Sequence, residues 1–419
     1  MQLVAGNAKV SEVEAYAGNV LIDACGPILS PAEALRQMLY LPPLPKDIDM
    51  TPTHIRKHQL ADILRIHIPT SAGLDLAESI GFMIRQGYVH RNPVNPSTWQ
   101  RIYAPGAADS SLAAVQLGST VVGLSGVGKS TAVERALALF PQVVTHERFP
   151  GLMGPVHQLL WLKVDVPQSG KIKELVENFA IATDSALGTD YASQVLSGSK
   201  KSGGTLANQW LQKVFCHFPG LLVLDEIQNL FKIERKAVRE AAARRRVAQR
   251  PTLRVSDDEA LKLILTLNNT TKIPMLASGT PDGIEALGSR MSTIQRLVTA
   301  GFHRIPHAVS AEDDFFRNRL FPQLCKYQWQ PDQLKPTDEL RHLLYELSGG
   351  IFRICMALWI HAHRRSFERG GRQLSLEDFR YAAAYSLAPL QPAVKAILSG
   401  DPRLLLQYED LLPEKFAYW

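Results

Sequence analysis

A glycine-rich stretch, Gly123 to Thr131, carries the residue types and the spacing that hold a nucleoside triphosphate. Its sequence, GLSGVGKST, fits G-x-x-x-x-G-K-[ST] without a mismatch, and in this pattern backbone N–H groups surround the phosphates. Gly126 and Gly128 provide the backbone freedom and close approach that a side chain would prevent. A chance match is expected in on the order of one chain in a hundred. The stretch therefore predicts a phosphate-binding P-loop.

Two polar residues of the loop, Lys129 and Ser130, have specific expected roles. Lys129 is expected to reach the β- and γ-phosphates and to act in catalysis, and the Ser130 hydroxyl is expected to coordinate Mg²⁺. The residues expected to contact the nucleotide are Gly123, Ser125, Gly126, Val127, Gly128, Lys129, Ser130 and Thr131. A short apolar strand before the loop and a helical pattern after it, from Thr131 to Phe140, support this interpretation.

A second motif, Gly220-Leu-Leu-Val-Leu-Asp-Glu-Ile-Gln228, ends an apolar run in two acids. Asp225 is expected to hold Mg²⁺, and Glu226 to orient or deprotonate the attacking water. Such endings are common on surface strands, but this one follows a P-loop with a strand and two helices between. The chain has no Asn-Lys-x-Asp guanine signature, so ATP and Mg²⁺ are the predicted cofactors.

Two further positions are candidate phosphate sensors. The strand predicted over Lys272–Pro281 ends in small polar residues, which would place Ser278 or Thr280 near the γ-phosphate; the alternative is an ordinary turn with a hydroxyl helix cap. Arg353 follows two glycines in the first turn of a predicted helix, where the alternative is a surface arginine.

The elements that must position these residues alternate between strand and helix. Leu159–Asp165 is a near-continuous apolar run, which suits a parallel strand buried on both faces. Predicted helices follow over Ile172–Leu187 and Leu206–Phe218. From Ala311 onward apolar residues recur at helical spacing in four segments, 313–325, 336–348, 351–369 and 375–387. The pattern indicates an α/β region followed by a helical one.

Length and composition set the remaining expectations. A chain of 419 residues predicts two or three domains. Four scattered cysteines without a C-x-x-C pair predict buried thiols in a reducing cytosol, with no disulfide framework or zinc site. Neither a signal-peptide pattern nor an apolar run of membrane-spanning length is present, so we expect a soluble, cytoplasmic protein with no membrane partner.

The most charged stretch, Phe231–Arg250, holds eight basic residues against two acidic ones. Charge runs of this kind usually form a solvated helix face. Because one sign dominates, contact with nucleic-acid phosphates is the alternative, and the residues leave both open. The first 115 residues likewise leave open a packing appendage and a partner-docking surface.

Taken together, these residues resemble an AAA+ ATPase, and within that group the TnsC/TniB regulators of transposition. The P-loop, the Asp225-Glu-x-Gln228 motif and Gly279-Thr-Pro281 carry the wider resemblance. Arg85–Pro93 and Gln407–Leu412 favour TnsC. The resemblance implies an α/β P-loop ATPase with a parallel sheet sandwiched by helices. It implies a mixed N-terminal extension (1–115), an ATPase core (116–308), a smaller all-helical lid (309–395) and a tail (396–419).

The resemblance also implies a function. Such proteins bind duplex DNA as homo-oligomeric rings or helical filaments, link a TnsD/TniQ-type target selector to a TnsA/TnsB-type transposase, and disassemble on ATP hydrolysis. An arginine finger from the neighbouring subunit would be Arg296, with Arg290 second. DNA contacts would come from Ser169, Lys171, Lys173, Lys200 and Lys201. The alternatives are a helicase loader or replication initiator and a signalling AAA+ module that does not bind DNA.

Overall fold

The computed structural model describes residues 13–103, 116–197, 201–230, 263–269, 271–287, 291–405 and 408. The chain forms two compact units. Unit 1 comprises Met1–Ala34, Ala72–Val122 and Val133–Arg304, and unit 2 comprises Leu35–Ser71, Gly123–Ala132 and Ile305–Trp419. The predicted division into four consecutive segments (1–115, 116–308, 309–395 and 396–419) is a different kind of division and stays a prediction. The basic stretch 232–250, Lys200, Arg290 and the motif 407–412 lie outside the described residues, apart from Tyr408.

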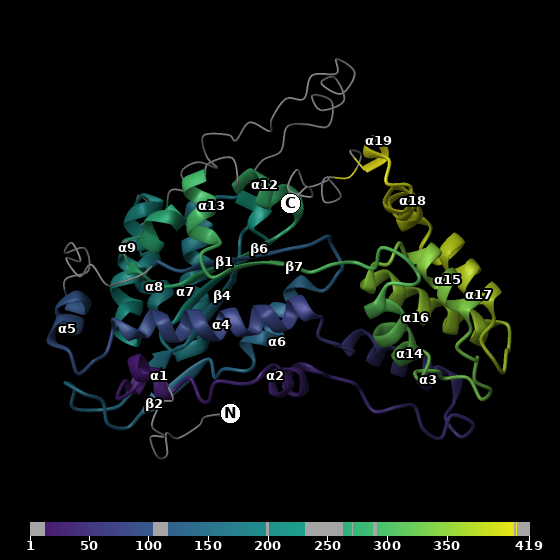
Figure 1. Cartoon of the computed structure of the whole chain (residues 1–419), viewed down its shortest axis with the longest axis horizontal. Helices are drawn as coiled ribbons and strands as arrows, with labels where there is room; N and C mark the ends of the chain where they lie inside the picture. The colour runs from purple at the N-terminus through teal and green to yellow at the C-terminus, as the bar shows by residue number, and fades with distance from the viewer. Residues whose placement is uncertain are drawn as a thin grey trace. The chain divides into compact units, whose positions relative to one another are not determined.

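Unit 1 is built on a five-stranded, all-parallel sheet with the strand order β4-β5-β6-β1-β7 (Figure 1). Its strands are β1 (Gly118–Val122), β4 (Trp161–Asp165), β5 (Leu221–Asp225), β6 (Met275–Gly279) and β7 (Gly301–Arg304). Every residue of β1, β5 and β6 is buried, as expected of central parallel strands covered on both faces. The predicted α/β class is confirmed.

The strand register brings the carboxyl ends of β1, β4, β5 and β6 to one edge of the sheet. Asp165 pairs with Asp225 across β4 and β5, and Val122 pairs with Gly279 across β1 and β6. The P-loop begins at the residue after Val122. Ligands of open parallel sheets bind at the carboxyl ends of the strands, so this edge is where a site is expected.

The predicted strand over Leu159–Asp165 is two strands. β3 (Val156–Leu159) pairs antiparallel with β2 (Val143–His146), and after Leu160 the chain enters the main sheet as β4. β4 is an edge strand whose burial alternates, so the prediction of burial on both faces was wrong. The incompletely buried positions are Trp161, Lys163 and Asp165, which alternate along the strand and therefore share one face.

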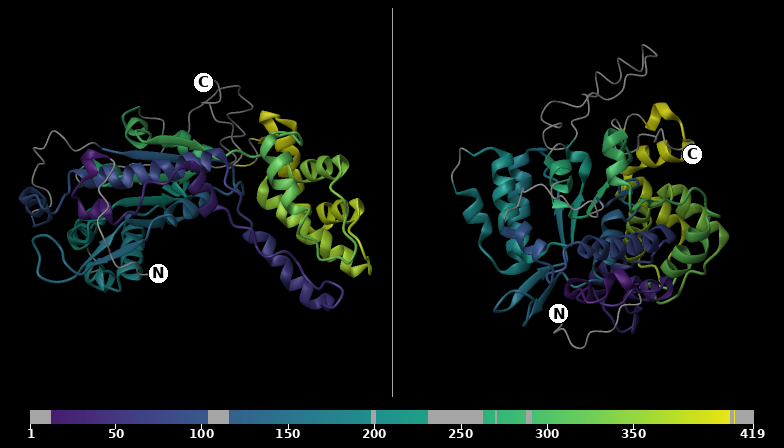
Figure 2. Two further views of the ribbon diagram at one scale, coloured as in Figure 1. Left: turned by 60° about the horizontal axis from the view of Figure 1, so that its bottom comes forward. Right: turned by 60° about the vertical axis from the view of Figure 1, so that its left-hand side comes forward.

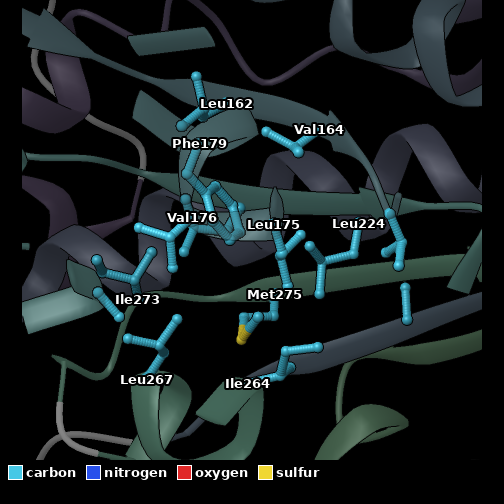
Figure 3. Close-up of a cluster of buried hydrophobic side chains, with 14 of the residues drawn as sticks. Leu162, Val164, Leu175, Val176, Phe179, Leu224, Ile264, Leu267, Ile273 and Met275 are labelled. Atoms are coloured by element: carbon cyan, nitrogen blue, oxygen red, sulfur yellow. The ribbon is translucent and has the colours of Figure 1, made fainter. Parts of the chain in front are cut away.

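A continuous apolar core joins the sheet to α7 (Ile172–Leu187) and α9 (Gly203–Val214), which lie with α8 (Tyr191–Leu196) on one side of the strands (Figure 2). Figure 3 shows side chains of β4, β5 and β6 meeting those of α7, among them Leu162, Leu224 and Met275. Phe179 and Trp210 stack with ring centroids 4.8 Å apart and tie α7 to α9. The bounds predicted for α7 are confirmed to the residue.

Helix α4 (Ser71–Val89) packs against the start of the strands. Tyr88 is fully buried and its hydroxyl donates to the Phe218 carbonyl at 2.7 Å, while Gly87 lies against Pro274. The helix therefore extends into Arg85–Pro93, the stretch that carries part of the sequence resemblance. The other elements of this unit are η1 (Glu14–Tyr16), α1 (Val20–Asp23), α5 (Pro96–Tyr103), η3 (Phe215–His217), η4 (Ile227–Leu230), α12 (Pro281–Leu287) and α13 (Met291–Leu297).

Two elements span the unit boundaries along the chain. Helix α2 (Pro31–Met38) begins at a capping box: the Glu33 N–H donates to the Ser30 hydroxyl, and the Ser30 N–H donates to the Glu33 carboxylate at 2.8 Å. Helix α6 (Lys129–Leu137) begins at the last three residues of the P-loop.

Unit 2 is helical, as predicted for the C-terminal region. Its core joins Leu60 and Ile63 to the C-terminal helices, and the Tyr327 hydroxyl donates to the Pro42 carbonyl at 2.6 Å. Residues 35–71 thus belong to the same core as residues that follow 305. The elements are α3 (Thr53–Gln59), η2 (Leu60–Arg65), η5 (Phe316–Leu320), α14 (Phe321–Leu324), α15 (Asp338–Ser348), α16 (Phe352–Glu368), α17 (Leu376–Tyr381), η6 (Ala382–Ser386), η7 (Ala388–Leu390), α18 (Gln391–Ser399) and α19 (Pro402–Leu405).

Three of the four cysteines are buried in the structure. Cys25, Cys325 and Cys355 are buried, and burial raises the pKa of each thiol to about 12. Cys216 is exposed, so the prediction that all four are buried was wrong. Within the described ranges no single helix is long and apolar enough to span a membrane; α15 and α16, bent by 115° at their junction, meet that test only as a pair, by length and composition.

Candidate nucleotide-binding site

The P-loop has the backbone geometry that its glycines predict. Gly126 and Gly128 have φ of +83° and +98°, a region that favours glycine. Helix α6 starts at the next residue, and the Ala132 N–H donates to the Gly128 carbonyl at 2.8 Å. Backbone N–H groups at the start of a helix are not used within it and carry the positive end of the helix dipole. The loop thus ends on a helix N-terminus suited to an anion.

The side chains of the loop differ in exposure. Lys129 is 9% exposed and its ammonium donates to the Leu124 carbonyl at 3.0 Å, which folds it back over the loop. Val127 is buried, whereas Ser130 is half-buried. Ser125 and Thr131 are exposed. The Ser130 residue, whose hydroxyl is predicted to ligate Mg²⁺, is therefore partly accessible to solvent.

Arg353 lies against the P-loop within unit 2. Its backbone N–H donates to the Gly126 carbonyl at 3.1 Å. A Cβ on Gly126 would lie 3.2 Å from Cβ of Arg353 and 3.1 Å from Cγ2 of Ile351, so the glycine permits the approach. The Arg353 side chain is exposed. The structure thus brings the predicted arginine sensor to the loop.

The acidic motif lies at the end of β5. Asp225 is 2% exposed, and one carboxylate oxygen accepts from the Glu226 N–H at 3.0 Å. The other lies 3.3 Å from the ammonium of Lys163. Glu226 is exposed and has φ of +57°, uncommon for a residue with a side chain. The turn aims the second acid away from the strand.

Lys163 was not among the predicted site residues. Its ammonium also lies 2.7 Å from the Glu134 carboxylate on α6, and only 18% of its side chain is exposed. Burial opposes its charge, but the hydrogen bond to Glu134 and the charge of Asp225 outweigh this and raise its pKa. A single lysine inside an apolar strand was the feature of the sequence that could have pointed to this site. The sequence alone does not show its partners, Glu134 and Asp225.

Gln228 joins the acidic motif to the end of β6. Its side-chain oxygen accepts from the Thr280 N–H at 3.2 Å, and its side-chain nitrogen donates to the Glu226 carboxylate. Gly279 and Gly283 make room, since a Cβ on Gly283 would lie 2.6 Å from Cβ of Gln228. The sequence placed this glutamine in a motif but did not assign it a role.

The two predicted hydroxyl sensors, Ser278 and Thr280, are buried. Neither side-chain oxygen has a hydrogen-bond partner among the described residues. The Thr280 hydroxyl therefore does not form the helix-cap bond that was the alternative interpretation. Buried hydroxyls without partners are uncommon and call for a ligand or water.

The two predicted DNA-contact loops lie side by side. Cγ2 of Ile172 would lie 2.2 Å from a Cβ on Gly203, so the stretch Ser169–Lys173 adjoins the stretch that holds Lys201. Ser169 donates to Glu174 at 2.5 Å, and the Lys171 ammonium lies 3.5 Å from the same carboxylate. Lys173 is exposed, and Lys201 donates to Gln209 at 3.1 Å.

Arg296, the predicted finger, is half-buried near the end of α13. Its carbonyl would lie 2.2 Å from a Cβ on Gly118, which anchors this end of α13 beside β1. Its action on a neighbouring subunit stays a prediction. Among the residues that the structure describes, no cluster of three or more His, Cys, Asp or Glu could hold a metal.

Comparison with known proteins gives one family match. Residues 116–287 match the family described as AAA domain. No curated protein matches the chain. Solved structures that resemble it include the ORC1 protein of Aeropyrum pernix in complex with DNA, with 16% identity over 72% of this chain and 70% of that chain and a TM-score of 0.43.

Two other similar structures are more distant. One is the Walker-type ATPase paby2304 of Pyrococcus abyssi, with 13% identity over 68% of this chain and 72% of that chain and a TM-score of 0.39. The other is Drosophila ORC bound to DNA, with 11% identity over 94% of this chain and 72% of that chain and a TM-score of 0.40. Likenesses this weak carry no argument about function. Over residues 116–287 the chain is therefore similar to the AAA domain family, and this segment holds the P-loop and the parallel strands β1, β4, β5 and β6.

Proposed function

We propose that the chain binds ATP with Mg²⁺ at Gly123–Thr131 and hydrolyses it. The observation that carries this proposal is the P-loop, in which two glycines with positive φ lead directly into the N-terminus of α6. Lys129 would leave the Leu124 carbonyl for the β- and γ-phosphates. Hydroxyl and carboxylate oxygens are ligands that Mg²⁺ takes together with phosphate, so Ser130 and Asp225 would hold it.

The remaining residues would act on the γ-phosphate and on water. When bound, Mg²⁺ would neutralise charge on the phosphates. Glu226 would accept the proton of the attacking water, because its side chain leaves the strand and is exposed. The hydroxyls of Ser278 and Thr280, which have no hydrogen-bond partner among the described residues, would sense the γ-phosphate, and Arg353 would add positive charge at the loop.

Two variants test this proposal. Lys129→Ala should remove ATP binding, measured by titration with a fluorescent ATP analogue. Glu226→Gln should bind ATP as the wild type does and release phosphate at least a hundredfold more slowly, as expected for loss of a catalytic base. Wild-type ATP binding by Lys129→Ala would refute the P-loop assignment, and wild-type hydrolysis by Glu226→Gln would refute the base.

We further propose that the domain binds duplex DNA through Ser169–Lys173 and Lys200–Lys201, in an oligomer completed by Arg296 from a neighbour. The adjacency of the two basic loops supports a shared phosphate-binding surface. Contacts to backbone phosphates would be independent of sequence and sensitive to salt. The absence of DNA binding at low salt in the presence of an ATP analogue would instead indicate a signalling module.

Two roles remain for a DNA-bound ATPase of this kind. One is that of a replication initiator or helicase loader, and the other is that of a transposition regulator between a TnsD/TniQ-type selector and a TnsA/TnsB-type transposase. The second rests on the sequence resemblance alone. Negative-stain imaging with DNA separates them: rings that load a helicase support the first role, and filaments that persist with a non-hydrolysable analogue and retain a transposase support the second.

A further inference from the structure

Lys163 is the shared partner of three carboxylates in unit 1. Its ammonium lies 2.7 Å from Glu134, 3.3 Å from Asp225 and 3.9 Å from Asp165. The three acids differ in exposure: the side chains of Glu134 and Asp165 are 59% and 71% exposed, and that of Asp225 is 3% exposed. Water can therefore solvate Glu134 and Asp165, whereas Asp225 depends on Lys163.

A buried carboxylate is costly unless it is paired and hydrogen-bonded, because it has lost its hydration. Asp225 also accepts from the Glu226 N–H, but that bond alone does not neutralise its charge. Lys163 supplies the charge from β4, directly beside β5. The same ammonium is held by Glu134 on α6, the helix that starts at the P-loop.

We propose that Lys163 is a positioning residue that serves as the internal counter-ion of Asp225 and shares its charge with Glu134. This inference rests on the proposed function, in which Asp225 is a ligand of Mg²⁺. While Lys163 neutralises Asp225, a nucleotide meets less repulsion in the absence of metal. The extent to which Lys163 pairs with Asp225 and not with Glu134 then sets how strongly nucleotide binding depends on Mg²⁺.

The test measures the dissociation constant of a fluorescent ADP in EDTA and divides it by the dissociation constant in excess Mg²⁺. Lys163→Met leaves Asp225 without its counter-ion, so binding in EDTA should weaken and the ratio should rise by about fivefold or more. Glu134→Gln leaves the ammonium to Asp225, so the ratio should fall. Lys163→Arg keeps a cation and should restore most of the wild-type ratio.

The outcomes distinguish this inference from a purely structural role. A structural role predicts a lower melting temperature for Lys163→Met with an unchanged ratio, and that result would overturn the proposal. The double variant Lys163→Met/Asp225→Asn provides the control, since the effect of Lys163→Met on the ratio should vanish when Asp225 is neutral. If Lys163→Met does not fold, the exposed Glu134→Gln variant carries the test, and an unchanged or higher ratio refutes the proposal.

Failure of the proposed function gives a different result. If the wild type binds no fluorescent ADP, or binds it equally in EDTA and Mg²⁺, the assignment of the site is wrong. If the wild-type ratio exceeds one and neither variant moves it, the site assignment stands and the role of Lys163 is refuted.

Discussion

The backbone N–H of Arg353 donates to the carbonyl of Gly126 at 3.1 Å, and this bond joins the start of α16 to the middle of the P-loop. The approach depends on glycines on both sides. Gly126 has no side chain to collide with Arg353, and Gly350, with φ of +72°, turns the chain so closely past Ala308 that a Cβ would lie 2.1 Å from its carbonyl oxygen. The start of α16 is therefore fixed against the P-loop by backbone contact.

Arg353→Met should weaken ATP binding by about tenfold and leave ADP binding within about twofold of the wild type. Methionine keeps an unbranched stem beside Gly126 but lacks the guanidinium that would meet the γ-phosphate. Titrations with ADP and a non-hydrolysable ATP analogue measure the difference. Gly126→Ala is the contrasting variant, because strain at φ of +83° should weaken both nucleotides. An equal loss of ATP and ADP binding in Arg353→Met would rule out γ-phosphate sensing.

Gln228→Ala should lower kcat for ATP hydrolysis by about tenfold and leave KM nearly unchanged. The reason is that Gln228 holds the Glu226 carboxylate while it is itself held by the Thr280 N–H. Gln228→Glu keeps the length of the side chain but cannot donate to Glu226 and should be at least as slow. Steady-state phosphate release measures both constants. A wild-type kcat in Gln228→Ala would show that Glu226 needs no support from this residue.

Glu174→Gln should strengthen DNA binding at low salt, because Glu174 pairs with Lys171 and accepts from Ser169. Glu177→Gln, with the same charge change at an exposed position of α7, is the matched control and should have a smaller effect. Lys171→Glu/Lys173→Glu should weaken binding and flatten the salt slope by roughly 0.9 for each lost phosphate contact. Fluorescence anisotropy over a salt series measures both. An unchanged salt slope in the double variant would show that Lys171 and Lys173 do not contact the DNA phosphates.

His363 should make the protein less stable as the pH falls from about 6.5 to about 4. Complete burial lowers its pKa to about 4, and the neutral ring donates to the Trp359 carbonyl and accepts from the Trp329 N–H. The unfolded chain takes up a proton below its ordinary pKa of about 6.5, whereas the folded chain resists. The stabilisation is present above about pH 6.5, and about 3 kcal/mol of it is lost by pH 4.

The control for this prediction is His363→Gln, which cannot titrate. Urea denaturation across the pH range should give a steeper decline of the unfolding free energy for the wild type than for the variant. Other titrating groups contribute to both proteins and cancel in the comparison. Parallel curves would contradict the prediction.

The features that the sequence predicted well are encoded in short, contiguous stretches. The P-loop and the apolar run of β5 that ends in Asp225 and Glu226 depend on local spacing. The apolar residues of α7 likewise indicate a helix over Ile172–Leu187 without reference to the rest of the chain. The glycines at 126 and 128 were identified because the pattern itself requires positive φ there. These features are properties of neighbouring residues, so periodicity and spacing reveal them.

The partners of side chains from distant segments depend on the tertiary structure. The sequence shows Lys163 as an interruption of an apolar run; the register of β4 beside β5 places it at Asp225, and the packing of α6 adds Glu134. Likewise, the fold brings Ile172 against Gly203, and residues 35–71 into the core of the C-terminal helices. Register, helix packing and close glycine contacts depend on the whole sheet and core, and spacing along the chain does not encode them.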